Sequence, residues 1–258
     1  MQLIDSHAHL SSDDRMPLLE EILERAKDSH VSQIINICTD VKSLENGLAV
    51  EKRYPWVRNA GATTPHDVDR EGESAFESFA GAARSQRLIA IGETGLDYYY
   101  KHSTPSIQKE FLVRYLHLAI ECKLPVILHC RQAFDDLFSI TDVHYPSGAA
   151  AVFHCFTGTV LEAKQGLDRG WMISFSGIIT FKNSEELREV VRFVPLESIL
   201  IETDAPYLAP QSKRGQSNEP SFILETARCL AGLKNVSLEE VARVTTANAR
   251  KVFKLFSL

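Results

Sequence analysis

The N-terminal stretch Ile4-Asp5-Ser6-His7-Ala8-His9 combines apolar and metal-ligating residues in a pattern typical of a β-strand that ends at a metal site. Side chains alternate along a strand, so Asp5, His7 and His9 should share one face, with the two histidines roughly 6.6 Å apart. Two imidazoles at that separation can bind one ion at about 2.0–2.1 Å. Two polar residues at a strand end would show the same pattern, so this stretch alone does not identify a site.

Four later apolar runs end in the same kinds of residue. In each run the ligand-type side chain continues the parity of the apolar residues that we expect to face inward. These sets are Ile89, Ile91 and Glu93; Ile127 and His129; Val152 and His154; and Leu200, Glu202 and Asp204. Taken singly, each has an ordinary explanation, such as a hydrogen-bonded structural histidine or a carboxylate that caps a helix. Five strand ends of this kind in one chain predict a shared site.

The whole chain alternates short β-branched runs with longer segments of helical periodicity. The runs cover residues 3–6, 31–38, 57–62, 88–92, 126–129, 150–154, 171–175 and 199–203, and the helical segments cover 16–29, 41–53, 73–85, 106–122, 132–140, 160–169, 184–193 and 220–230, with a last helix from 237. Such alternation predicts βαβ units and a parallel sheet. Eight pairs in 258 residues fit an α/β fold of one (β/α)₈ TIM-type barrel, and we expect one domain over residues 1–258. A doubly wound open sheet is the alternative.

Composition restricts the class of protein. The chain has 28 Lys and Arg against 34 Asp and Glu, a formal net charge of −6, and 44% hydrophobic residues, which is typical of a soluble globular protein. An acidic chain argues weakly against nucleic-acid binding, since such proteins usually carry basic patches. The five cysteines are scattered and lack C-x-x-C spacing, which indicates reduced thiols. Without a signal-peptide pattern or a membrane-length apolar run, we expect a cytoplasmic protein that contacts no membrane and needs no obligate protein partner.

The number of ligand-type side chains favours two metal ions over one. A catalytic zinc keeps three protein ligands and an open position, and this chain offers six candidates. They are His7, His9, Glu93, His129, His154 and Asp204. Glu93 is the natural bridging carboxylate. Two divalent ions would bring about +4 against −2 from the two carboxylates, which suits an anionic substrate, and paired ions roughly 3.5–4 Å apart suit phosphoryl displacement.

Several blocks of the chain resemble the signature blocks of the TatD family of metal-dependent deoxyribonucleases. They are IDSHAHL (4–10), GETGLDY (92–98), LPVILHCR (124–131), HCFTG (154–158), ETDAPYL (202–208), RG (214–215) and NEP (218–220). The resemblance implies an amidohydrolase-like barrel with two divalent metal ions per chain, of Mg, Mn, Co or Zn. It also implies hydrolysis of phosphodiester bonds, including exonuclease action on DNA.

The resemblance also assigns roles to the six candidate ligands. It gives His7, His9, Glu93 and Asp204 to one ion, and Glu93, His129 and His154 to the other. Asp204 is then also the general base for the metal-bound water, so Asp204 and Glu93 are the predicted catalytic residues.

One family segment is altered in this chain. Where the family usually shows Gly-x-His-Pro-His, residues 62–66 read Ala-Thr-Thr-Pro-His, so Thr64 replaces the first histidine. Thr64 is a poor metal ligand, which puts substrate positioning there in question. His66 remains a candidate phosphate contact, although a turn residue beside Pro65 would look the same.

Other substrate contacts are predicted from residues that follow strands. Arg131 and Arg214 could each bind a phosphate through two parallel hydrogen bonds, although Arg214 could equally be a solvated surface residue. Tyr98, Tyr99 and Tyr100 could stack a nucleic-acid base or simply pack their loop.

The leading functional hypothesis is a metal-dependent phosphodiesterase that acts on nucleic acid, with DNA as the expected substrate. The alternative keeps the site but hydrolyses an ester or amide bond in a small molecule or an aminoacylated RNA. A third hypothesis, a barrel that only binds a partner, is disfavoured because all six ligand types are present. Histidine and carboxylate sites accept several divalent metals, so the pattern does not select one.

Overall fold

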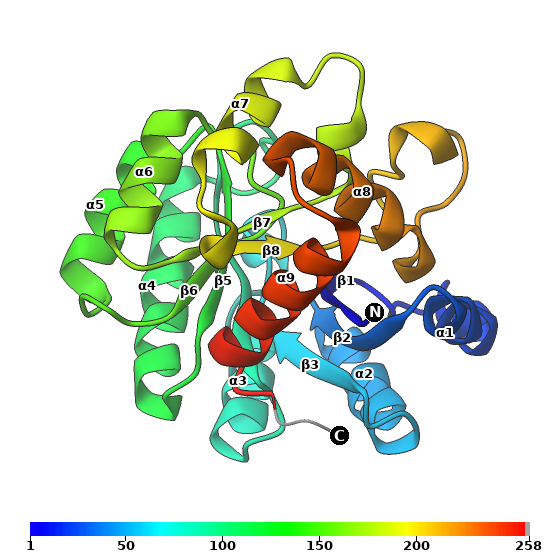
Figure 1. Cartoon of the computed structure of the whole chain (residues 1–258). Helices are drawn as coiled ribbons and strands as arrows, with labels where there is room; N and C mark the ends of the chain where they lie inside the picture. Colours follow the sequence, from blue (N-terminus) through cyan, green and yellow to red (C-terminus); the bar gives the residue numbers. More distant parts are fainter. Residues whose placement is uncertain (256–258) are drawn as a thin grey trace.

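The fold, given by a computed structural model that describes residues 1–255, is built on one parallel sheet of eight strands. The strands lie in sequence order: β1 (Leu3–Ala8), β2 (Val31–Cys38), β3 (Val57–Gly61), β4 (Ala90–Asp97), β5 (Val126–Arg131), β6 (Ala151–Phe153), β7 (Met172–Phe175) and β8 (Ile199–Ile201). The first and last strands meet where Ala8 pairs with Ala205 and the Asp204 N–H donates to the His7 carbonyl at 2.9 Å. The sheet therefore forms a nearly closed barrel (Figure 1), which confirms the TIM-type prediction over the open sheet.

Helices surround the barrel and follow the strands in alternation (Figure 1). They are α1 (Leu19–Asp28), α2 (Val41–Arg53), α3 (Val68–Arg84), α4 (Pro105–Cys122), α5 (Phe134–His144), α6 (Val160–Asp168), α7 (Glu185–Phe193), α8 (Ile223–Lys234) and α9 (Leu238–Val252). Short 3₁₀ turns lie at Met16–Leu18, Gly177–Thr180, Leu196–Ser198, Gln211–Lys213 and Pro220–Phe222. Local capping explains two starts: Asp40 and Ser43 cap α2 reciprocally, and Ser237 accepts from the Glu240 N–H at α9. Within residues 1–255, no helix has the length and apolar character to cross a membrane.

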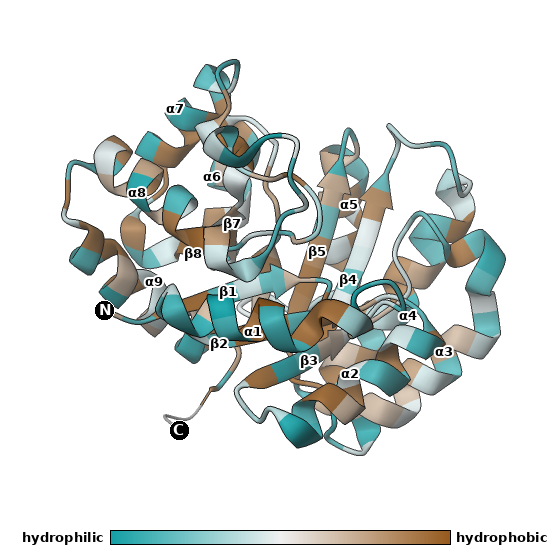
Figure 2. Cartoon of the chain, turned by 90° about the vertical axis from the view of Figure 1, so that its right-hand side faces the viewer, coloured by the Kyte–Doolittle hydropathy of each residue, from teal (hydrophilic) through white to brown (hydrophobic). Residues whose placement is uncertain are grey.

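The inside of the barrel is filled with aliphatic side chains up to the level of the strand ends. The inner layer consists of Ile4, Ile35, Ile37, Ala60, Ile89, Ala90, Ile127, Val152 and Leu200. Helix α9 packs against this layer with Ala249, Val252 and Phe253. A second, larger cluster lies between the outer strand faces and the helices, and Figure 2 shows apolar residues on the strands and on the helix faces that meet them. The polar side chains of the barrel therefore gather at the C-terminal strand ends.

Two β-bulges change which side chains point inward. In β1, Asp5 pairs with Ile34 and Ala8 with Asn36, so three steps on β1 oppose two steps on β2. Ser6 and His7 therefore both turn into the barrel, and Asp5 does not lie with His7. The expectation that Asp5, His7 and His9 share one face is wrong for Asp5.

The second bulge lies in β4. Ile91 pairs with Val126 and Thr94 with Leu128, which again sets three steps against two. Ile91 packs in the outer cluster with the helices, so the predicted inward parity of Ile91 is wrong. Glu93 reaches the barrel end because of the bulge at Gly92 and Glu93. The simple alternation predicted for His129 and His154 is confirmed, since Ile127 and Val152 lie in the inner layer.

Candidate metal centre

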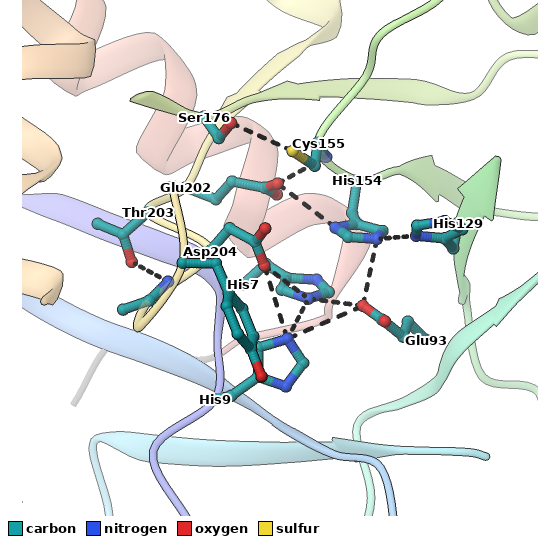
Figure 3. A network of polar contacts seen from close by, with 12 residues as sticks. His7, His9, Glu93, His129, His154, Cys155, Ser176, Glu202, Thr203 and Asp204 are labelled. Atoms are coloured by element: carbon teal, nitrogen blue, oxygen red, sulfur yellow. Dashed lines mark hydrogen bonds and ion pairs between the residues drawn. The ribbon is translucent and has the colours of Figure 1, made fainter. Parts of the chain in front are cut away.

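The Glu93 carboxylate points toward histidines from other strand ends of the barrel (Figure 3). Its Oε2 is 2.9 Å from His7 Nε2, 3.2 Å from His154 Nε2 and 4.0 Å from His9 Nε2. Three imidazole nitrogens from β1 and the end of β6 thus converge on one carboxylate oxygen supplied by β4. Although Oε2 is buried, none of the described residues donates a hydrogen bond of normal geometry to it.

Asp204 completes one side of this cluster. It follows β8 in a left-handed conformation with φ +59°, which aspartate tolerates better than most residues. Its Oδ1 lies 3.6 Å from His9 Nε2 and 3.7 Å from His7 Nε2, and these two nitrogens are 3.3 Å apart. His7, His9 and Asp204 therefore present three donor atoms that could hold one metal ion.

The other side of the cluster is formed by His129 and His154. His129 Nδ1 lies 3.1 Å from His154 Nε2, and both rings lie beside Glu93 (Figure 3). Glu93, His129 and His154 form a second group that could hold an ion. All six predicted ligands thus gather in one place, with Glu93 between the two groups.

Two carboxylates that were not assigned a role from the sequence lie behind these histidines. Asp97 Oδ2 is 2.8 Å from His129 Nε2, and Glu202 Oε1 is 3.5 Å from His154 Nδ1. The hydrogen bond between Asp97 and His129 is the kind that orients metal-binding histidines, whereas Glu202 only lies beside His154 Nδ1, which has no hydrogen-bond partner among the described residues. Both residues stand at the C-terminal ends of strands, and that position is the sequence signal that could have identified them.

Hydrogen bonds from backbone N–H groups and one hydroxyl hold both carboxylates in place. Asp97 Oδ1 accepts the N–H groups of Tyr99 and Tyr100 at 2.9 and 2.7 Å. Glu202 Oε1 accepts the Cys155 N–H at 2.6 Å, and its Oε2 accepts the Ser174 hydroxyl at 2.5 Å. Neither carboxylate can turn without breaking these bonds.

Asp5 has a different function in the structure. Its carboxylate accepts the Thr203 hydroxyl at 2.6 Å, the Thr203 N–H at 3.0 Å and the His7 N–H at 3.3 Å. Burial raises the pKa of Asp5 to about 7. Asp5 therefore joins the β1 bulge to the segment that carries Asp204, where the barrel closes.

Burial and nearby charges shift the pKa values of the side chains in the cluster. Burial would lower the pKa of His154, but Glu93 and Glu202 raise it to about 9. Burial, together with the neighbouring His154, lowers the pKa of His7. Despite burial, His154 and His7 hold the pKa of Glu93 well below its usual range, and the nearby His9 imidazole likewise lowers the pKa of the buried Asp204.

The donor set fits divalent metal ions. Imidazole nitrogens and carboxylate oxygens are the ligands that Zn²⁺ and related ions take in proteins, and an ion would satisfy the buried Glu93 oxygen. The sequence estimate of about +2 for a two-ion site omitted Asp97 and Glu202. With these two carboxylates included, the formal sum falls to about zero.

The predicted substrate contacts differ in how they lie relative to the candidate metal ligands. His66 lies beside the cluster, with Nε2 3.7 Å from Asp97 Oδ2 and its ring centre 5.3 Å from that of His129. Arg131 ends β5 and places its guanidinium 3.8 Å from the Tyr99 ring centre. His66 and Arg131 are therefore close to residues that hold the candidate metal ligands.

Arg214 and Thr64 make their contacts with residues outside the six candidate ligands. The Arg214 guanidinium lies over the Phe181 ring at 4.6 Å, and no hydrogen bond or ion pair among residues 1–255 joins it to the six ligands. Thr64, which replaces the family histidine, donates its hydroxyl to Asp67 Oδ2 at 3.1 Å. Thr64 therefore supports the loop after β3.

A (β/α)₈ barrel whose strand ends carry a histidine and carboxylate cluster of this kind defines the class of metal-dependent hydrolases. Residues 4–254 match the model of the family described as TatD related DNase. The chain belongs to this TatD family of metal-dependent hydrolases.

Relatives of similar length support this assignment. The chain is 35% identical over 253 residues to the uncharacterized metal-dependent hydrolase YabD of Bacillus subtilis, covering 98% of this chain and 99% of that protein. It is 33% identical over 261 residues to the 3'-5' ssDNA/RNA exonuclease TatD of Erwinia tasmaniensis, covering 98% and 100%. Among solved structures, the TatD homologue YjjV of Escherichia coli superposes with a TM-score of 0.93 at 28% identity, covering 98% of each chain.

Proposed function

We propose that this chain is an exonuclease that hydrolyses phosphodiester bonds at the end of a nucleic-acid strand, with DNA as the expected substrate. The observation that carries the proposal is the position of Glu93, whose Oε2 lies within 4.0 Å of three histidine nitrogens and joins two groups of metal-type donors. The similarity to a relative named as a single-stranded DNA and RNA exonuclease supports this substrate class.

Two divalent ions would be held by the two groups already described. His7, His9, Glu93 and Asp204 would bind one ion, and Glu93, His129 and His154 would bind the other. When bound, such ions supply Lewis acidity that activates water and offsets charge on the phosphate in the transition state.

The side chains of the protein perform the remaining tasks. Asp204 is ionised at neutral pH, since its pKa lies below the ordinary carboxyl value, and we assign it as the base that takes the proton from the attacking water. Arg131 follows His129 by two residues on the same inward parity of β5, and we assign it to the phosphate, together with His66. Arg214 lies over Phe181 and has no bond to the six candidate ligands, so it would contact only a part of the substrate away from the metal ions.

The free thiols are consistent with the predicted cytoplasmic location. All five cysteines lack a disulfide partner, which is the usual state in a reducing compartment such as the cytoplasm.

The test uses the full chain loaded with Mg²⁺, Mn²⁺, Co²⁺ or Zn²⁺ and end-labelled single-stranded and double-stranded DNA. We expect stepwise shortening of the strand from one end, with close to two ions per chain by elemental analysis. Asp204→Asn should abolish turnover and leave the far-UV circular dichroism unchanged. An Asp→Asn change at Asp142, an exposed residue paired with Arg169, serves as the matched control.

Two outcomes would contradict the proposal. Near-normal turnover in Asp204→Asn would remove Asp204 from its role as base. Failure to cleave DNA or RNA with any of the four metals, combined with turnover of acyl esters, amides or aminoacylated RNA, would show that the site serves the alternative chemistry.

A further inference from the structure

A cavity of about 510 Å³ lies next to the candidate metal centre, between the loops that follow β3 and β4. It is lined by His66, Asp67, Asp69, Arg70, Tyr100 and His102. We propose that this cavity, which we call the base pocket, holds the base of the unpaired nucleotide next to the scissile phosphodiester. The inference rests on the proposed function, because it names the part of a nucleic-acid substrate that the cavity recognises.

His66 connects the base pocket to the metal centre. Its imidazole lines the cavity, and its Nε2 lies 3.7 Å from Asp97 Oδ2, which in turn holds His129. The His66 and His129 ring centres are only 5.3 Å apart. A group in the cavity is therefore one side chain away from the candidate ligands, which fits a base attached to the reacting nucleotide.

The aromatic rings of Tyr100 and His102 form one wall of the pocket. Their planes are inclined by only 15°, with centres 5.8 Å apart, and His66 meets Tyr100 edge-on at 5.5 Å. Tyr100 is 43% exposed although it lies among these rings, so part of its surface is available to a ligand. The Arg131 guanidinium lies 4.8 Å from the Tyr100 ring centre and restrains it. Flat aromatic surfaces of this kind stack nucleic-acid bases of any sequence.

The charges in the pocket favour a base over a phosphate. Asp67 and Asp69 contribute two carboxylates, and the one cation, Arg70, is engaged by Asp67 at 2.7 Å and by Glu71 at 3.0 Å. This lining repels a phosphate, whereas carboxylate oxygens can accept hydrogen bonds from the N–H edge of a base. The phosphate is left to the metal centre, to Arg131 and to His66, which stands between the pocket and the metal centre.

Hydrogen bonds between the two loops fix the shape of the pocket. The Ser103 hydroxyl donates to the His66 carbonyl at 2.7 Å and accepts the Asp69 N–H at 3.2 Å. Asp69 Oδ2 accepts the Thr104 N–H at 2.9 Å. A site that is already formed loses little entropy on binding, and its volume falls within the roughly 300–1,000 Å³ of small-molecule pockets.

The test compares single-stranded oligonucleotides that differ in one terminal nucleotide, using the metal-loaded full chain. Three strands are compared: one has an abasic nucleotide at the 3′ end, one has it at the 5′ end, and one has normal nucleotides at both ends. We expect the abasic nucleotide to lower kcat/KM of the wild type about 5- to 100-fold at the digested end, which corresponds to the usual strength of base stacking. Tyr100→Ala should cause a similar loss on the normal strand and no further loss on the abasic strand.

Matched variants separate stacking from general damage. Tyr100→Phe and His102→Phe keep the aromatic surface and should retain most activity, whereas His102→Ala should behave like Tyr100→Ala. Phe193→Ala, which removes another partly exposed aromatic ring on α7, should leave both substrates unchanged. Metal content and unfolding temperature are measured for every variant.

The outcomes distinguish this inference from the proposed function. Tyr100→Ala could lower kcat/KM equally on the normal and abasic strands, or not lower it at all. Either result would show that the pocket does not hold a base, even though the enzyme cleaves DNA. A wild type that cleaves neither strand would overturn the proposed function itself. A wild type that cleaves both strands equally well would overturn the base pocket alone.

Discussion

His129 Nε2 lies 2.8 Å from Asp97 Oδ2, while the other nitrogen of the same ring lies 3.1 Å from His154 Nε2. Since Asp97 is ionised and accepts hydrogen bonds only, it selects the His129 tautomer with a proton on Nε2. The Nδ1 lone pair is then directed into the cluster. A residue outside the ligand set thus determines which His129 nitrogen can bind a metal.

Asp97→Asn should reverse this arrangement. Because Tyr99 and Tyr100 both donate to Oδ1, the oxygen of the new side-chain amide must stay on their side and its NH₂ group must face His129. His129 Nε2 would then accept, and the proton would move to Nδ1, which faces the cluster. We expect metal affinity to fall about 10- to 100-fold, measured by calorimetric titration of the chelator-treated protein.

A change of the same type elsewhere provides the control. Asp142→Asn removes a charge from the surface of α5 and should leave metal affinity unchanged. Unaltered affinity in Asp97→Asn, with the fold intact by circular dichroism, would contradict the role given to Asp97.

Glu202 should respond differently to amide and apolar substitutions. In Glu202→Gln the amide oxygen can keep the Cys155 N–H, and the new NH₂ group can donate to the Ser174 hydroxyl. Glu202→Leu instead leaves the Cys155 N–H without its acceptor, at a cost of roughly 1–3 kcal/mol, and leaves the Ser174 hydroxyl only its bond with Ser6. Urea unfolding should show a small change for Gln and a loss of at least ~1 kcal/mol for Leu. Equal stability of the two variants would contradict this assignment.

The fold was predictable from the sequence because its signals are local. Strand and helix periods alternate eight times, and the regular alternation of β5 and β6 correctly directed His129 and His154 inward. In β1 and β4 the same rule failed for Asp5 and Ile91, since a bulge depends on pairing with the next strand and leaves no periodic signal.

The supporting shell of the site was less predictable than the ligands. Asp97 meets His129 because Gly95 pairs with His129 across β4 and β5, and that register is a tertiary property. Arg214 was predicted as a phosphate contact like Arg131, with a solvated surface residue as the equal alternative, and its loop places it over Phe181. Residue type and strand position identify candidate ligands, whereas the partners of these candidates follow only from the register of neighbouring strands.

Gly95→Ala should separate β4 from β5. Gly95 has φ +146°, which L residues rarely adopt, and an added Cβ would lie 1.9 Å from the His129 carbonyl oxygen. Neither strand can move without disturbing Glu93 or His129. We expect a loss of at least ~3 kcal/mol in the free energy of unfolding, or no folded protein, measured by urea unfolding.

A second glycine provides a control, because its substitution should raise the free energy of unfolding instead of lowering it. Gly81 lies within α3, and a Cβ there would contact nothing within 4 Å. Gly81→Ala should stabilise the protein by about 0.5–1 kcal/mol, because alanine loses less conformational entropy in a helix. Similar effects of the two substitutions would contradict the close approach of β4 and β5.

Metal removal should destabilise the protein even when no substrate is present. The carboxylates of Glu93, Asp204, Asp97 and Glu202 each lie beside a histidine of the same cluster, and bound ions would offset their negative charge. A divalent ion at 100 times its Kd adds about 2.7 kcal/mol, and each kcal/mol raises Tm by about 2–4 °C in a chain of this size. Returning Mn²⁺ or Zn²⁺ to chelator-treated protein should therefore raise Tm by about 5–11 °C in a thermal melt.

The bridging position of Glu93 gives this experiment its sharpest control. Glu93→Gln keeps the shape of the side chain but removes the charge that both donor groups share, so most of the metal-dependent rise in Tm should disappear. Glu121→Gln changes an exposed glutamate paired with Arg84 and should leave the rise intact. A wild-type Tm that does not respond to ions, or a full response in Glu93→Gln, would show that these residues do not form the metal site. Because the measurement needs no substrate, it tests the site independently of whether DNA, RNA or another ester is hydrolysed.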